Sequence, residues 1–173
     1  MNYANQEIRV LAIHPTRRGF GFTVFEPGEK LVDWGLKEVR HDTNEQCMRL
    51  IEKLIQRYQP DIIVMEDLVA KITRRGPRVK MLLRRVARLA ARKDIECRRF
   101  SRSKIMGSFT GSLINKYQVA NIIAAKLPEL APRLPKPRKP WMPEDPRMSI
   151  FGATALALTF FSDKREGSPN DSF

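Results

Sequence analysis

The order of strand-like and helix-like segments constrains the fold of this chain more than any other feature. Three segments rich in β-branched and aromatic residues come first, separated by turns that contain proline or glycine: 8–13, 19–25 and 30–39. They predict an antiparallel meander. Apolar residues at helical spacing over 43–58 predict a helix that Pro60 ends. The short segment 61–66 is almost wholly apolar, which predicts a strand in the centre of the sheet.

The second half of the chain continues the alternation of helices and strands. Apolar residues at helical spacing predict a helix over 79–90. Further segments follow in this order: a strand at 95–100, a short turn or helix from Arg102, a helix from 115 that Pro128 ends, an extended proline-rich connection over 128–146 and a last helix from about Asp145. Together these elements predict an α/β fold with a mixed five-stranded sheet, whose first three strands are antiparallel, and helices on both faces.

Length and composition favour a single domain. A chain of 173 residues with 42% hydrophobic content can bury one substantial core. We therefore expect one domain over 1–162 and a polar, disordered tail over 163–173. The two cysteines, Cys47 and Cys97, lack paired spacing, so we expect buried apolar residues rather than a disulfide or a zinc site.

The net charge of +13 favours a polyanionic partner, and nucleic acid is the commonest one. A membrane is the alternative partner. We exclude it because no apolar run is long enough to span a bilayer and the first residues lack the basic and apolar regions of a signal peptide. We therefore expect a cytoplasmic protein.

Positive charge is concentrated in the segment 71–93, which holds ten lysines and arginines and no acidic residue. Charge on a helix face often serves solubility alone, but such clustering is tolerated more readily where phosphates neutralise it. We predict nucleic-acid contacts from Arg74, Arg75, Arg78, Lys80, Arg84, Arg85, Arg88, Arg92, Arg102 and Lys104. Phe109 and Trp141 could stack on an unpaired base, although aromatic residues in loops more often pack onto their own domain.

Three residues are candidates for chemistry. Glu66 stands at the carboxyl end of the central strand, where open α/β sheets present functional groups, and pairing with a nearby arginine is its alternative role. His14 ends the first strand and is either a metal ligand or a histidine that hydrogen-bonds a neighbour. Asp145 precedes Pro146, a pattern typical of a helix start, so a structural role competes with metal binding there.

Several motifs resemble those of the RuvC-type Holliday-junction resolvases. Residues 11–22, Leu-Ala-Ile-His-Pro-Thr-Arg-Arg-Gly-Phe-Gly-Phe, are similar to the opening motif of that family, a hydrophobic strand followed by Asp-Pro-Gly and a further glycine. Residues 58–66 resemble its second motif, 116–119 its Lys-x-Gln-Val helix start, and 153–159 its C-terminal Ala-Leu-Ala helix. The resemblance extends to about residue 161 and implies a ribonuclease H-like fold.

The resemblance also implies a metal site built from four carboxylates, which this chain retains only in part. His14 takes the position of the first aspartate, and Ser149 and Gly152 stand where the family has two acidic residues. Glu66 remains, with Glu144 and Asp145 about a turn upstream of the missing pair. Two Mg²⁺ ions need several oxygen ligands, whereas an imidazole ligand favours Mn²⁺ or Zn²⁺.

We therefore predict a nucleic-acid-binding protein of the Holliday-junction resolvase type that recognises structured or branched DNA, with an incomplete metal site and weak or absent cleavage. The alternative is an active endonuclease dependent on Mg²⁺ or Mn²⁺, either a junction resolvase or an RNA-processing nuclease, which uses Glu66 with His14 and Asp145 as catalytic residues and metal ligands.

Two further expectations rest on the resemblance. Lys116 resembles the family lysine near the scissile phosphate, so we add it to the predicted nucleic-acid contacts. The family resemblance also implies a homodimer, to which the apolar residues of 79–90 or 43–58 could supply the interface.

Overall fold

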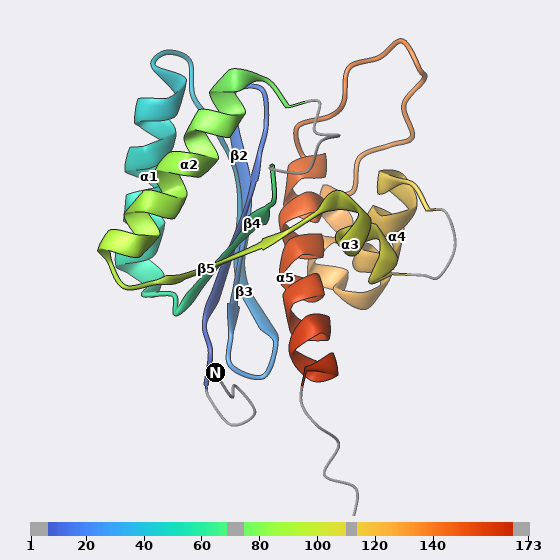
Figure 1. Ribbon diagram of the computed structural model, residues 1–173. Helices are drawn as coiled ribbons and strands as arrows, with labels where there is room; N and C mark the ends of the chain where they lie inside the picture. Colours follow the sequence, from blue (N-terminus) through green and yellow to red (C-terminus); the bar gives the residue numbers. More distant parts are fainter. Residues whose placement is uncertain (1–6, 69–74, 110–113, 168–173) are drawn as a thin grey trace, which may run out of the picture.

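A computed structural model describes residues 7–68, 75–109 and 114–167. Within these residues, five strands form one sheet in the order β3-β2-β1-β4-β5 (Figure 1). Their bounds are β1 Val10–Pro15, β2 Gly19–Glu26, β3 Lys30–Glu38, β4 Ile62–Glu66 and β5 Glu96–Phe100. β2 pairs antiparallel with β1 and β3, whereas β4 pairs parallel with β1 and β5. The predicted mixed sheet with three antiparallel strands at the start is confirmed.

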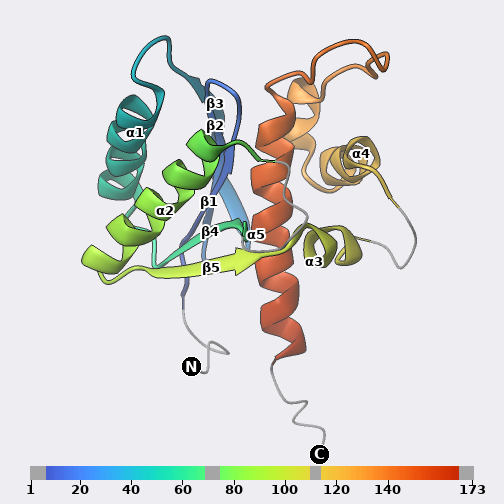
Figure 2. The same ribbon diagram turned by 45° about the horizontal axis from the view of Figure 1, so that its top comes forward.

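Helices cover both faces of the sheet, as predicted. α1 (Thr43–Tyr58) and α2 (Pro77–Arg92) lie side by side on one face, and α5 (Met148–Glu166) lies on the other (Figures 1 and 2). Three shorter helices lie on the far side of α5 from the sheet: α3 (Arg102–Gly107), α4 (Lys116–Lys126) and the 3₁₀ helix η1 (Pro128–Arg133).

Alternate residues of the central strands enter two separate apolar cores. Ala12 and Val64 belong to the core beneath α5, whereas Leu11 belongs to the core beneath α1 and α2. Ala12 and Val64 are also partners in the β1–β4 register. Because side chains two positions apart point to the same face of a strand, His14 and Glu66 lie on the α5 side of the sheet.

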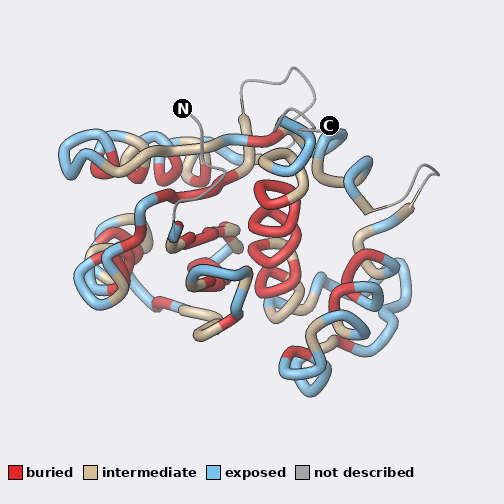
Figure 3. Tube along the Cα trace, turned by 90° about the horizontal axis from the view of Figure 1, so that it is seen from below, coloured by how far each residue is buried: buried red, intermediate tan, exposed pale blue. Residues whose placement is uncertain are grey.

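The helix α5 is buried on nearly every side, because the sheet covers one side and α3 and α4 cover another (Figure 3). Apart from Gly152, every residue from 149 to 161 is buried. Phe161 packs edge-on against Phe25 of β2, with ring centroids 5.4 Å apart. A helix buried in this way needs no polar face, which explains its nearly continuous apolar sequence. None of the helices in the described residues has the length and apolar character needed to cross a membrane.

Two boundaries differ from the sequence-based expectation. α5 continues through Glu166, so residues 163–166, expected in a disordered tail, are helical. The first part of the expected extended connection, Pro128–Arg133, forms a 3₁₀ helix. The expectations for 71–74 and for the last part of the tail, 168–173, fall outside the described residues.

Both cysteines are free thiols, as expected from their spacing. Cys47 is buried in α1 and Cys97 is partly buried in β5. Burial raises the pKa of each thiol, which keeps both in the unreactive protonated form near neutral pH.

Candidate functional site

The carboxyl ends of β1 and β4 bring together two of the predicted site residues, His14 and Glu66. Arg75, two residues before α2, joins them: its Nη2 lies 3.0 Å from His14 Nε2 and 3.1 Å from Glu66 Oε2. Arg75 Nη1 also donates a hydrogen bond of 3.2 Å to the carbonyl oxygen of Pro15. We call the end of the molecule that carries this cluster of His14, Glu66 and Arg75 the site end.

The ion pair between Arg75 and Glu66 is shielded from water, since the two side chains are 25% and 11% exposed. Solvent screens such a pair less than one on the open surface. A guanidinium can only donate, so His14 Nε2 accepts, and the imidazole is neutral with its proton on Nδ1. Burial lowers the pKa of His14 well below its usual value, and the charges of Arg75 and Lys116 lower it further. In the described part of the chain, His14 Nδ1 is buried without a hydrogen-bond partner.

Gly152 in α5 leaves the space that the His14 ring occupies. A Cβ atom at position 152 would lie 2.5 Å from His14 Cδ2 and 2.8 Å from His14 Nε2. These separations are too short for real atoms, so a larger residue at 152 requires the ring to move. Ser149 lies one turn before Gly152 in α5, and it packs closely against Gly21 of β2. A Cβ at Gly21 would lie 2.4 Å from the carbonyl carbon of Ser149. The Ser149 hydroxyl donates to the carbonyl oxygen of Pro146 at 2.6 Å.

Asp145, the third predicted site residue, is not brought to His14 and Glu66. Its carboxylate accepts from the Arg147 backbone N–H at 2.9 Å and from Arg147 Nη2 at 2.6 Å. The hydrogen bonds from the Arg147 side chain hold the pKa of Asp145 below its usual value. These contacts organise the turn before α5, which favours the structural role.

The arrangement at the site end does not fit a divalent metal ion. Across the described residues, no group of three or more His, Cys, Asp or Glu side chains is close enough together to hold one. A guanidinium has no lone pair to offer a metal. It would also repel one: at 4 Å and an effective dielectric constant of about 20, a unit positive charge and a divalent cation repel by about 8 kcal/mol. Arg75 therefore supplies the positive charge beside Glu66.

Five of the predicted nucleic-acid contacts make polar contacts within the chain. These are Arg75 at the site end, Arg78 with the carbonyl oxygens of Thr16 and Arg17, Arg85 with Glu45, Lys104 with Asp163, and Lys116 with Glu144. Within the described ranges, no ion pair holds Lys80, Arg84, Arg88, Arg92 or Arg102. Arg74 lies outside these ranges.

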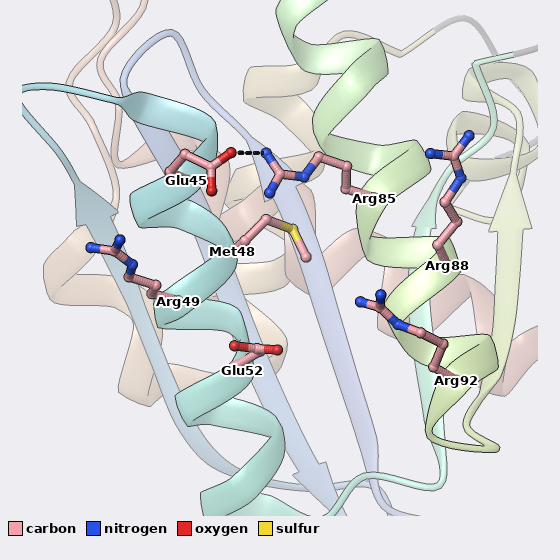
Figure 4. A pocket seen from close by; sticks show the side chains of 7 residues that line it. All are labelled: Glu45, Met48, Arg49, Glu52, Arg85, Arg88 and Arg92. Carbon is pink, nitrogen blue, oxygen red and sulfur yellow. Dashed lines mark hydrogen bonds and ion pairs between the residues drawn. The ribbon is translucent and has the colours of Figure 1, made fainter.

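A groove of about 400 Å³ lies between α1 and α2 (Figure 4). The side chains that line it are Glu45, Met48, Arg49, Glu52, Arg85, Arg88 and Arg92. Arg85 bridges the groove to Glu45 with a contact of 2.6 Å, whereas Arg88 and Arg92 extend from α2 without an acidic partner in the described structure (Figure 4). The groove is cationic overall, which suits a phosphate backbone rather than an apolar partner.

Two solved structures of RuvC have the same fold as this chain. A structure of Thermus thermophilus RuvC matches with a TM-score of 0.68 and 15% sequence identity, covering 92% of this chain and 97% of that one. T. thermophilus RuvC in complex with a Holliday junction substrate matches with a TM-score of 0.66 and 16% identity, covering 92% and 96%. The chain thus has a RuvC-like fold.

The yeast mitochondrial Holliday junction resolvase Ydc2 matches with a TM-score of 0.58 and 15% identity over 92% of this chain and 80% of that one. No protein-family model and no curated protein matches the sequence. At these identities the likeness establishes the fold, and the expected ribonuclease H-like fold is confirmed.

Proposed function

We propose that this protein, which has a RuvC-like fold, binds branched DNA and does not cleave it in a metal-dependent reaction. One protein of this fold has been solved with a Holliday junction substrate, which makes a branched duplex the first ligand to test. The net charge of +13 supports binding to a phosphate backbone, as do the cations on α2 that have no ion-pair partner among the described residues.

The observation that carries the proposal is the position of Arg75. Its guanidinium lies between His14 and Glu66, with contacts of 3.0 and 3.1 Å. A fixed monovalent cation neutralises Glu66 and holds β1, β4 and the start of α2 together. These contacts keep the shape of the site. The guanidinium cannot activate a water molecule as a bound metal ion does, so the site lacks the step that generates the nucleophile.

A binding experiment tests the first half of the proposal. Fluorescence anisotropy should show tighter binding to a four-way DNA junction than to a linear duplex of the same length. Binding should persist in EDTA and weaken steeply as salt rises, because phosphate contacts release counterions. RNA of the same branched design serves as a competitor. Preferential binding of RNA would redirect the proposal to an RNA partner.

A cleavage assay tests the second half. We expect no nicking of a labelled junction with Mg²⁺ or Mn²⁺, and we expect neither ion to raise the melting temperature, because a resident metal would stabilise the folded state. Nicking that disappears in Glu66→Ala would establish the alternative, an endonuclease that uses Glu66 with His14 or Asp145. Glu66→Gln is the matched variant, since it keeps the shape and removes the charge that pairs with Arg75.

A further inference from the structure

We infer that Trp141 forms a stacking platform for an unpaired base of the bound DNA. The inference rests on the proposed function and names a contact within it. Trp141 is the most exposed of the large hydrophobic residues in the described structure, with 77% of its surface accessible. The other tryptophan, Trp34, is partly buried and packs against the core beneath α5. An indole left this open offers both size and flat surface to a ligand.

The loop that carries Trp141 holds a defined shape. Four prolines lie within residues 135–143, and each restricts the backbone. The backbone N–H of Met142 donates to the carbonyl oxygen of Lys139 at 2.9 Å, which closes a turn. Arg138 Nη1 donates to the carbonyl oxygen of Met142 across the same turn. A ring presented on a rigid loop loses little conformational entropy on binding.

The surroundings of Trp141 are cationic. Between 133 and 143 the chain has four basic residues and no acidic one: Arg133, Lys136, Arg138 and Lys139. The ammonium group of Lys139 lies 5.2 Å from the centroid of the Trp141 ring. An aromatic face among lysines and arginines is the combination that binds single-stranded nucleic acid, with the base on the ring and the phosphates on the cations.

The position of the loop connects it to the site end. Glu144, which follows the loop, pairs with Lys116 at 3.2 Å, and the charge of Lys116 acts on His14. The loop, orange in Figures 1 and 2, extends beyond the N-terminal end of α5, at the end of the molecule where α2 begins. A DNA strand that crosses the site end would therefore pass close to this loop.

The chemistry selects unpaired bases over intact duplex. A base inside a duplex has both faces covered by its neighbours, so an indole can stack on it only after the base is unstacked, which costs free energy. Branch points, gaps and single-stranded arms expose base faces. Trp141 should therefore increase affinity for DNA with unpaired bases and contribute little to fully paired duplex.

Tryptophan fluorescence tests the inference directly. The chain has two tryptophans, so Trp34→Phe leaves Trp141 as the only one, and excitation at the red edge of the absorption band avoids the emission of the three tyrosines. Titration with a junction that carries a short unpaired gap should quench this emission in proportion to binding, measured on the same samples by anisotropy of labelled DNA. A fully paired duplex, added to equal occupancy, should quench it much less.

Substitution of Trp141 supplies the second measurement. Trp141→Ala should weaken binding to gapped DNA by about tenfold, within the range expected for loss of one stacked base, and leave duplex affinity nearly unchanged. Trp141→Phe should retain most of the affinity. Since Trp141 is exposed, neither variant should alter the melting temperature.

The outcomes separate this inference from the proposed function. Anisotropy that shows DNA binding, with no quenching and no loss in Trp141→Ala, would overturn the platform and leave the proposed function intact. Absence of DNA binding in anisotropy would overturn both. A blue shift of Trp141 emission with anionic lipid vesicles, without any response to DNA, would assign the loop to a membrane surface and also reject the inference.

Discussion

The His14 ring occupies the space that a side chain at Gly152 would need, and this links two residues that are far apart along the chain. The His14 ring lies where a side chain at 152 would begin, with a Cβ contact of 2.5 Å. An imidazole at the end of β1 therefore requires glycine at this position of α5. Neither position 14 nor position 152 carries a carboxylate, and the two residues found there pack together as one unit. The hydrogen bond between Arg75 and the His14 ring completes this packing.

We predict that Gly152→Ala changes the free energy of unfolding with opposite sign in two backgrounds. With His14 present, the added methyl group must displace a ring that Arg75 holds, which should destabilise the protein by about 1–3 kcal/mol. In His14→Ala the space is open, and alanine should stabilise the helix by up to about 1 kcal/mol over glycine. Urea denaturation of the four proteins measures both effects. The same sign in both backgrounds would show that the two positions do not compete for space.

Sequence reasoning could place His14 and Glu66 at the site because both end strands whose apolar pattern is clear. It could not identify Arg75. That arginine is one of ten cations in the segment 71–93, and nothing in a linear pattern distinguishes the one that turns inward. Lys104 shows the same limit, because its partners Asp163 and Glu166 lie on the last turns of α5, in the stretch expected to be a tail.

At the scale of elements, α2 divides its two faces between separate tasks. Most of its apolar residues are buried in the chain's own core, whereas Met81 is 46% exposed. The buried ones are Val79, Leu82, Leu83, Val86, Leu89 and Ala90. The exposed face carries Arg84, Arg88 and Arg92. The predicted amphipathic stripe is confirmed, but its apolar side is not available to a second chain.

The continuation of α5 past 162 could not be predicted from the local sequence. It depends on a contact between distant segments, because Arg98 of β5 pairs with Asp163 of α5 at 2.8 Å.

We predict that Arg88 and Arg92 contribute phosphate contacts and that Arg85 contributes less. Removing both with alanine should weaken binding to all DNA sequences and reduce the slope of log K against log salt by roughly two units, about one for each lost contact. Arg85→Ala on the same helix is the matched control, since Glu45 already neutralises this arginine at 2.6 Å. Equal slopes for the double variant and the unmodified protein would show that Arg88 and Arg92 do not contact phosphates and only keep this helix face solvated.

At the scale of the whole molecule, net charge affects both the binding of DNA and the association of two copies of the chain. A charge of +13 attracts a polyanion and repels a second copy of the same chain. The family resemblance implies a homodimer, to which the apolar residues of 79–90 or 43–58 could supply the interface. Most of those residues fill the core beneath the two helices, as Met48 and Ile51 of α1 and Leu82 of α2 do. A dimer formed through this face would bring exposed arginines together.

The homodimer stays a prediction, and its salt dependence should be opposite to that of DNA binding. Salt shortens the range of charge repulsion, from about 8 Å at physiological ionic strength to about 3 Å at 1 M, so two cationic chains should associate more tightly as salt rises. DNA binding should weaken over the same range because counterion release becomes less favourable. Sedimentation velocity of the free protein from 0.1 to 1 M salt measures the first trend. The variant with Arg88 and Arg92 replaced by alanine should dimerise at lower salt if α2 faces the partner. A monomer at every salt concentration would exclude a homodimer of the free protein.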